Sequence, residues 1–166
     1  LGALLDAVPH TREVKITGRA SSKELSKKAR WLGIRNSGYQ GPTGIHSAFA
    51  EACAKNHIPH ANIWGHCPHY VQTSPNPVTS FALLERLKSL VDIDLDMSEL
   101  DLAGQAFREE ISNAIAKQPD VSSYVSRLEH QYDEAKHSQN EMPTGTDMVE
   151  EIENFLKSQS SGQEQE

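Results

Sequence analysis

The sequence is poor in aromatic residues and cysteine, and it holds no long apolar run. Aromatic side chains make up 6% of the 166 residues, which predicts a mostly aliphatic core. The 2 cysteines, Cys53 and Cys67, match neither a disulfide framework nor a zinc-site spacing. No apolar stretch approaches the length of a bilayer-spanning helix, and no secretory signal peptide is visible. We therefore expect a reducing, cytoplasmic environment.

An excess of positive charge is also lacking. The formal net charge is -7 at pH 7, so no broad basic surface is available to neutralise nucleic-acid phosphates or to bind anionic membranes. The composition is that of a folded domain, with 37% hydrophobic and 23% charged side chains. A chain of 166 residues is long enough for one domain, or for a small domain with an appendage.

The organisation of the chain changes after Val91. Residues 1–91 have the pattern of an α/β layer, residues 92–157 of a helical region, and residues 158–166 of a polar, disordered tail. The chain begins at Leu1 rather than Met, and its first five residues resemble the end of a strand that enters a loop. We expect that an N-terminal part of the natural protein is absent from this sequence.

Short elements alternate in the first part of the α/β layer. Val14 and Ile16 alternate with polar residues, which predicts a short strand ended by Gly18. Ser21 has the position of an N-cap, with Glu24 completing a capping box, and a helix should run from there to about residue 30. Residues 33–38 should form a polar loop, and alanine-rich residues 47–54 a second helix.

The second part of the layer contains a strand and a longer helix. Residues 61–64 form an apolar run that predicts a buried strand. Asn76 should cap the next helix and Pro77 should occupy its first position. Apolar residues recur along that helix at helical spacing: Leu83, Leu84, Leu87, Leu90 and Val91.

The remaining chain predicts helices only. The acidic stretch at residues 92–101 reads as a solvated linker, because the glycine that a calcium loop requires is missing. One helix should begin near Met97. Asp120 should cap another after the break at Pro119, and that helix carries an apolar stripe: Val121, Tyr124, Val125, Leu128 and Tyr132.

A glycine-rich turn is the first candidate binding site. Gly41, Thr43 and Gly44 lie where backbone N–H groups at a helix start can hold an anion. The same glycines also suit a loop that needs close backbone approach, which is the commoner role. No lysine follows Gly44 in the manner of a nucleotide-binding P-loop.

Two similar signals follow apolar runs, at Pro9-His10-Thr11-Arg12 and Pro68-His69-Tyr70. If these runs are parallel strands, their ends lie at the same edge of a sheet, and His10, Arg12, His69 and Tyr70 converge near Gly44. Histidine can then move protons and arginine can bind a phosphate or carboxylate. The alternative is that both imidazoles anchor loops through hydrogen bonds. That alternative is favoured here, because neither a matching carboxylate nor a clear nucleophile accompanies them.

Several potential metal ligands lie close together in the sequence: His57, His60, His66, Cys67 and His69. Their spacing matches no standard site. They straddle a helix end and a strand, so their side chains need not point the same way. We therefore expect no metal and no cofactor. Cys67 has no paired base that would make it a nucleophile.

An ordered set of motifs in residues 1–90 resembles the proteasome assembly chaperone family, in its actinobacterial branch. The set continues more weakly near residues 124–129. Its main pieces are Leu1-Gly2-Ala3-Leu4-Leu5, Pro9-His10-Thr11-Arg12, Tyr39-Gln40-Gly41-Pro42-Thr43-Gly44-Ile45, Ala52-Cys53-Ala54, Ile58-Pro59, Pro68-His69-Tyr70-Val71 and Leu83-Leu84-Glu85-Arg86-Leu87.

The resemblance implies a three-layer α/β fold of the phosphorylase/hydrolase-like kind, here its C-terminal portion, followed by an all-helical appendage. It implies self-association, as a homotrimer, and members that extend further at the N-terminus. Eukaryotic and archaeal relatives bind proteasome α-subunits, some through a C-terminal hydrophobic-tyrosine-any-residue tail. Gly162-Gln163-Glu164-Gln165-Glu166 departs from that pattern. The family also usually lacks histidine at the positions of His60 and His66.

Two hypotheses follow. The first is a non-enzymatic binding or assembly protein that acts as a homo-oligomer and contacts proteasome subunits, without nucleic-acid or membrane partners. The second is a small-molecule phosphorylase or hydrolase that uses the turn at residues 41–44 with His10, Arg12 and His69.

Overall fold

The computed structural model describes residues 1–36 and 44–140. The chain divides into two compact units, residues 1–129 and residues 130–166. In the described part of the second unit, a helix places His130 Nδ1 3.3 Å from Glu134 Oε2, one turn further along. All the sites discussed below lie in the first unit.

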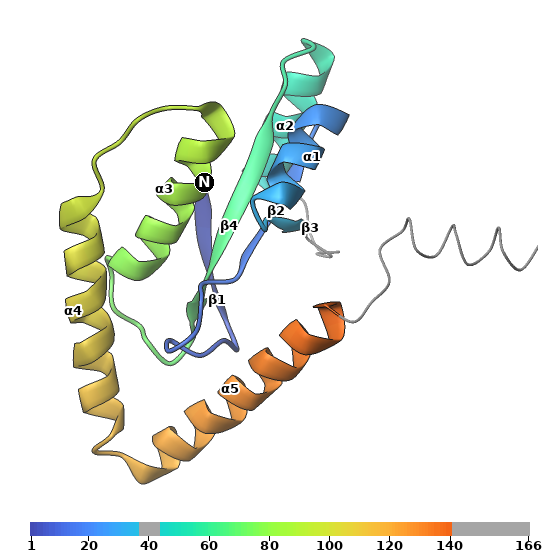
Figure 1. Ribbon diagram of the computed structural model, residues 1–166. Helices are drawn as coiled ribbons and strands as arrows, with labels where there is room; N and C mark the ends of the chain where they lie inside the picture. The colour runs from blue at the N-terminus through green and yellow to red at the C-terminus, as the bar shows by residue number, and fades with distance from the viewer. Residues whose placement is uncertain (37–43, 141–166) are drawn as a thin grey trace, which may run out of the picture. The chain divides into compact units, whose positions relative to one another are not determined.

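The first unit is α/β, as predicted, and is built around a four-stranded mixed sheet (Figure 1). The strands are β1 (Gly2–Asp6), β2 (Ile16–Ala20), β3 (Arg35–Asn36) and β4 (Ala61–Pro68), in the spatial order β1-β4-β2-β3. β1 runs parallel to β4, β2 runs antiparallel to β4, and β3 runs parallel to β2. The helices among the described residues are α1 (Lys23–Trp31), α2 (Ile45–Lys55), α3 (Pro77–Val91), α4 (Ser98–Ile115) and α5 (Pro119–Asn140).

Helices lie against both faces of this sheet. The aliphatic core groups Ile16, Ile34 and Ile63 with Leu83 and Leu90 of α3, and residues of α1 pack around it. On the opposite face, the His46 ring of α2 meets the Trp64 ring of β4 edge-on, with centroids 4.9 Å apart. Successive residues of β4 therefore face different helices, as the alternation of a strand requires.

Two glycines explain how closely these layers approach. A Cβ on Gly65 would lie 2.5 Å from Thr79 Cγ2, so β4 can contact α3 at this distance only without a side chain. A Cβ on Gly18 would lie 2.3 Å from the Asn62 carbonyl oxygen. The prediction that Gly18 ends a strand is therefore wrong, because Gly18 lies inside β2, where the backbone of β4 comes close.

Helix ends are partly as predicted. Asn76 caps α3 by accepting a hydrogen bond from the Thr79 N–H at 3.0 Å, with Pro77 in the first turn. The cap of α1 is Ser22 rather than Ser21; the Ser22 hydroxyl accepts from the Leu25 N–H at 3.2 Å. The Ser21 hydroxyl instead accepts from the His60 N–H at 2.9 Å, which links the residue before the α1 cap to the residue before β4.

Three further predictions need correction. The loop predicted over residues 33–38 contains the short strand β3, which pairs with β2. Asp120 lies in the first turn of α5 and does not precede it. Val91 is 52% exposed, although Leu83 and Leu90 of the same predicted stripe are buried. The turn residues 37–43 and the chain beyond Asn140 lie outside the described residues.

Candidate functional site

The parallel strands β1 and β4 end side by side and bring two loops together. Asp6 at the end of β1 pairs with Pro68 at the end of β4. The backbone N–H of His10 donates to the Tyr70 hydroxyl at 2.8 Å, and His10 Nδ1 lies 2.9 Å from the same oxygen. His10 and Tyr70, two of the four residues expected to converge near Gly44, are thus in contact.

His10 is buried and has partners on both ring nitrogens. Nε2 lies 3.1 Å from the Ser112 hydroxyl of α4. Burial lowers the pKa of His10. The positive charge of Arg108 lowers it further, whereas the negative charge of Glu129 acts in the opposite direction. Burial also raises the pKa of Tyr70, so the phenol keeps its proton and can donate it to His10 Nδ1. His10 is therefore neutral near pH 7 and acts as a link between a loop and α4.

His69 joins the same group from the other side. Its Nδ1 lies 3.1 Å from the Asp6 carbonyl oxygen, to which it donates, and its Nε2 lies 3.3 Å from the Tyr124 hydroxyl of α5. The His69 ring meets the rings of Tyr70 and Tyr124 edge-on, with centroids 5.7 Å apart in each pair. We call His10, His69, Tyr70 and Tyr124 the histidine–tyrosine cluster.

Arg12 lies beside this cluster and pairs with α5. Its guanidinium is 3.3 Å from Glu129 Oε1, and Arg12 is 34% exposed. The Thr11 hydroxyl also donates to Glu129. Arg12, which was expected to bind a phosphate or carboxylate of a ligand, therefore contacts a carboxylate of the protein itself.

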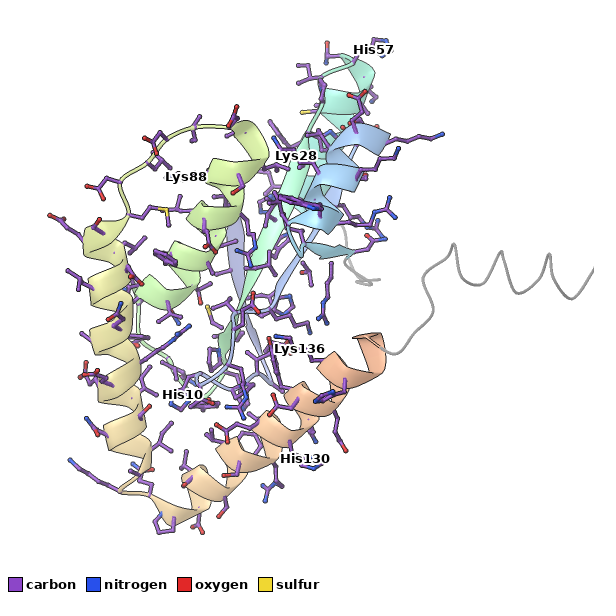
Figure 2. All side chains as sticks on the ribbon, in the orientation of Figure 1. His10, Lys28, His57, Lys88, His130 and Lys136 are labelled. Atoms are coloured by element: carbon purple, nitrogen blue, oxygen red, sulfur yellow. The ribbon has the colours of Figure 1, made fainter. Side chains whose placement is uncertain are left out.

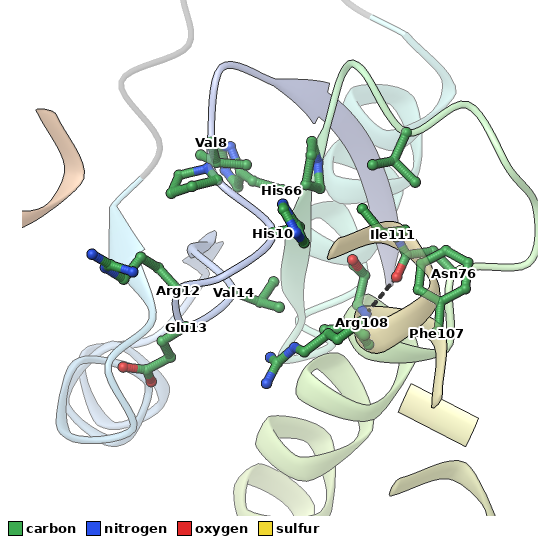
Figure 3. A pocket seen from close by; sticks show the side chains of 15 residues that line it. Val8, His10, Arg12, Glu13, Val14, His66, Asn76, Phe107, Arg108 and Ile111 are labelled. Atoms are coloured by element: carbon green, nitrogen blue, oxygen red, sulfur yellow. Dashed lines mark hydrogen bonds between the residues drawn. The ribbon is translucent and has the colours of Figure 1, made fainter. Parts of the chain in front are cut away.

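A small cavity borders the cluster (Figure 3). His10, Arg108 and Ile111 line it together with Val8 and Asn76. The space open to the centre of a water molecule is about 20 Å³, and about one such molecule fits a space of this size. The cavity as it stands cannot hold a metabolite.

Gly44 is the part of the glycine turn that the structure describes. Gly41 and Thr43 fall outside the described residues. Gly44 is exposed, begins α2, and has no atom within 4 Å of the position that a Cβ would take. The next turn of α2 contacts Trp64 through His46, within β4 rather than at its C-terminal end where His69 and Tyr70 follow.

The histidines considered for a metal do not form one group. Figure 2 shows His57 at the end of α2, remote from His10. The Cys67 thiol contacts Thr79 Oγ1 at 3.2 Å in the core, whereas His66 points to the other face of β4, toward Asp6. Among residues 1–36 and 44–140, no three His, Cys, Asp or Glu side chains form a group that could hold a metal ion.

The structure also reveals a polar chain across three strands that sequence reasoning missed. His66 Nδ1 lies 2.7 Å from Asp6 Oδ2, and His66 Nε2 lies 2.9 Å from Thr17 Oγ1. Lys15 Nζ approaches the same Asp6 oxygen at 3.0 Å. We call Asp6, His66 and Thr17 the strand relay. Polar residues on a sheet face were its only sequence signal, and the strand order was needed to assemble them.

The charge states of the strand relay follow from its contacts. Burial acts to raise the pKa of Asp6, but hydrogen bonds from Lys15 and His66 outweigh it and leave the pKa lowered. Burial lowers the pKa of His66, although the hydrogen bond with Asp6 opposes that shift. An ionised carboxylate only accepts, so His66 Nδ1 carries the proton and Nε2 accepts from the Thr17 hydroxyl.

Comparison with known proteins places this chain in a family. The PAC2 family profile matches residues 1–115. A proteasome-assembly chaperone homologue of Mycobacterium tuberculosis is 37% identical, with a TM-score of 0.63, over 74% of this chain and 51% of that one. A PAC2 family protein of Streptomyces avermitilis is 36% identical, with a TM-score of 0.62, over 74% of this chain and 50% of that one.

Another Mycobacterium tuberculosis protein, of unknown function, has a TM-score of 0.75 at 25% identity, over 84% of this chain and 46% of that one. Curated proteins give no match. This chain spans about half the length of the solved structures it resembles. The resemblance to the proteasome assembly chaperone family, including its actinobacterial members, is confirmed: the chain belongs to the PAC2 family.

Proposed function

We propose that this chain is a binding or assembly factor that works as a homo-oligomer, a homotrimer, in the cytoplasm, and that its partners include proteasome subunits. The observation that carries the proposal is the 37% identity to a protein described as a proteasome-assembly chaperone homologue. The cytoplasmic assignment is supported by Cys53 and Cys67, which are both free and buried. In the described part of the chain, no helix combines the length and the apolar character needed to span a membrane.

The proposed fold class is the three-layer, phosphorylase/hydrolase-like one, with residues 1–91 as the C-terminal part of an α/β domain and residues 92–157 as the helical appendage. Its support is the mixed sheet with α1 and α3 on one face and α2 on the other. A fold of this class does not by itself imply enzyme chemistry.

The histidine–tyrosine cluster fits an architectural role in such a protein. Both ring nitrogens of His10 and of His69 have protein partners. The cluster joins the loops after β1 and β4 to α4 and to the part of α5 before residue 130, so it fixes these segments on the α/β layer. The exposed surfaces of these helices then remain available for a partner.

Co-purification tests the assembly role. The full chain should bind purified proteasome α-subunits, and Leu102→Glu on α4 should weaken the complex, since Leu102 is 66% exposed. The matched control is Trp31→Glu on α1, where Trp31 is 86% exposed. Absence of a complex with wild-type protein, or equal weakening by both variants, would count against binding through the helical region. Sedimentation of the full chain tests the trimer.

A second candidate is the phosphorylase or hydrolase that would use the glycine turn with His10, Arg12 and His69. One observation favours it, since His10 and His69 both contact Tyr70. The cavity of about 20 Å³ and the engagement of Arg12 by Glu129 weigh against it. Phosphate-dependent turnover that His69→Ala abolishes while the fold persists would establish this candidate in place of the first.

A further inference from the structure

The strand relay joins three residues on neighbouring strands through one imidazole, and no loop takes part in these contacts. Asp6, His66 and Thr17 come from β1, β4 and β2, which are neighbours in the sheet. Asp6 and Thr17 bind opposite nitrogens of one imidazole, at 2.7 and 2.9 Å. In the Ser-His-Asp triad, the carboxylate likewise contacts Nδ1 of the histidine and the hydroxyl contacts Nε2. This triad recurs on unrelated folds and is recognised by its geometry.

The protonation of the relay suits a base. His66 is buried and neutral, with its Nδ1 proton held by Asp6, so that Nε2 presents a lone pair to the Thr17 hydroxyl. Lys15 on the same Asp6 oxygen keeps the carboxylate ionised. A hydroxyl in this position can lose its proton to the imidazole as it attacks.

The open end of the relay is the hydroxyl. His66 is 8% exposed, whereas Thr17 is half-buried, so part of this residue contacts solvent. Arg35 of β3 stands opposite Thr17 in the parallel register and is exposed. Residues paired in this way lie on the same face of a sheet. The Arg35 side chain therefore starts from the same sheet face as the Thr17 hydroxyl.

We propose that Thr17, His66 and Asp6 act as nucleophile, base and orienting carboxylate in the hydrolysis of small esters, an activity beyond the assembly role. The substrate class is an ester that carries a carboxylate, which Arg35 binds. This site is distinct from the histidine–tyrosine cluster, although Asp6 contributes to both, through its carboxylate here and its carbonyl there.

The reaction balances with water as the only co-reactant. Thr17 Oγ1 bonds to the ester carbonyl carbon and passes its proton to His66 Nε2. The carbon–alkoxy bond breaks, and the alcohol leaves with that proton. Water then attacks the threonyl ester, gives a proton to His66, and releases the acid as Thr17 regains its proton. Ester and water become acid and alcohol.

Hydrolysis of 4-nitrophenyl acetate and of mono-4-nitrophenyl succinate by the full chain tests the proposal. Thr17→Ala and His66→Ala should each lower kcat/KM by about 100-fold or more, whereas Thr17→Ser should retain activity. Thr73→Ala is the matched control, since Thr73 is an exposed loop residue. Wild type should prefer the succinate ester by about tenfold, and Arg35→Ala should remove that preference.

Mass spectrometry of the acylated protein locates the nucleophile even where a variant folds poorly. The acyl group should be found on the wild-type peptide that contains Thr17. An adduct on another residue, unchanged hydrolysis by Thr17→Ala, or no hydrolysis above buffer by wild type overturns the proposal. None of these outcomes bears on the binding of proteasome subunits, so the two proposals fail separately.

Lys15→Met tests the electrostatic effect of Lys15 on His66 through the pH dependence of kcat/KM, which a lysine with a purely structural role would not change. The groups that face His66 are the Asp6 carboxylate from β1 and Lys15, which precedes β2. Loss of the lysine charge raises the pKa of His66, so the acid limb of the kcat/KM profile should move to higher pH. An unchanged profile would contradict the role of His66 as the base.

Discussion

The two histidine groups of this protein start from the same residue and end differently. In the histidine–tyrosine cluster, imidazoles and phenols bond to one another and to helices α4 and α5. In the strand relay, the chain of hydrogen bonds lies within one sheet face and ends at the half-buried Thr17 hydroxyl. A closed network fixes positions, whereas an open one leaves a group that can react.

The largest effect is expected from Asp6→Ala, because it removes a carboxylate with three hydrogen-bonded neighbours, although the backbone carbonyl that contacts His69 remains. The carboxylate holds His66, Lys15 and the Ala7 N–H. Its removal should lower the free energy of unfolding by about 2–3 kcal/mol, since hydrogen bonds to a charged group are lost. Urea denaturation measures this, with Glu109→Ala on the exposed side of α4 as control. An unchanged midpoint for Asp6→Ala would show that the Asp6 carboxylate does not stabilise the fold.

Tyr70→Phe should damage only the closed network. The buried His10 N–H and Nδ1 both lose the Tyr70 hydroxyl. An unsatisfied buried donor predicts a loss of about 2 kcal/mol in the free energy of unfolding. Ester hydrolysis should not change. If stability is retained and hydrolysis falls, the roles assigned to the two groups are reversed.

Thr17→Val should abolish ester hydrolysis and leave stability nearly unchanged, the reverse of Tyr70→Phe. The hydroxyl has one protein contact among those described, with His66 Nε2, and valine nearly preserves the shape. We expect a loss of about 1 kcal/mol or less in the free energy of unfolding, together with loss of hydrolysis. Thermal unfolding and the ester assay on one preparation separate these quantities. A larger destabilisation than that of Tyr70→Phe would make Thr17 the more structural residue.

The smallest effect concerns pH and should appear in both groups. Burial lowers the pKa values of His10 and His66 below 6.5. The unfolded chain therefore binds protons first, so stability is full above about pH 6.5 and falls as pH drops toward the folded pKa values. His10→Gln and His66→Gln should each flatten this dependence in urea titrations between pH 7 and 5. A rise in stability on acidification would contradict the burial of neutral imidazoles.

Part of this arrangement could be predicted from the sequence. Apolar runs precede Pro9-His10 and Pro68-His69-Tyr70, and as parallel strands they would end at the same edge of a sheet. β1 and β4 are parallel and do end there. The Asn76-Pro77 pair predicted the start of α3, because local chemistry determines a helix cap.

The strand relay could not be predicted because its members depend on long-range pairing. Thr17 meets His66 only because β2 lies antiparallel to β4, between β4 and β3. Gly18 was assigned to a strand end for the same reason, since its close neighbour, the Asn62 carbonyl, is far away in the sequence. Likewise, nothing local indicated that Tyr124 and Glu129 of α5 would meet His69 and Arg12.

The state of the two buried imidazoles tests this account most directly. Long-range ¹H–¹⁵N NMR spectra at pH 7 report which ring nitrogen carries the proton. His66 should be neutral with its proton on Nδ1, toward Asp6, and His10 should be neutral with its proton on Nε2, toward Ser112. A His66 that is charged, or protonated on Nε2, would leave no acceptor for the Thr17 proton and would contradict the open relay.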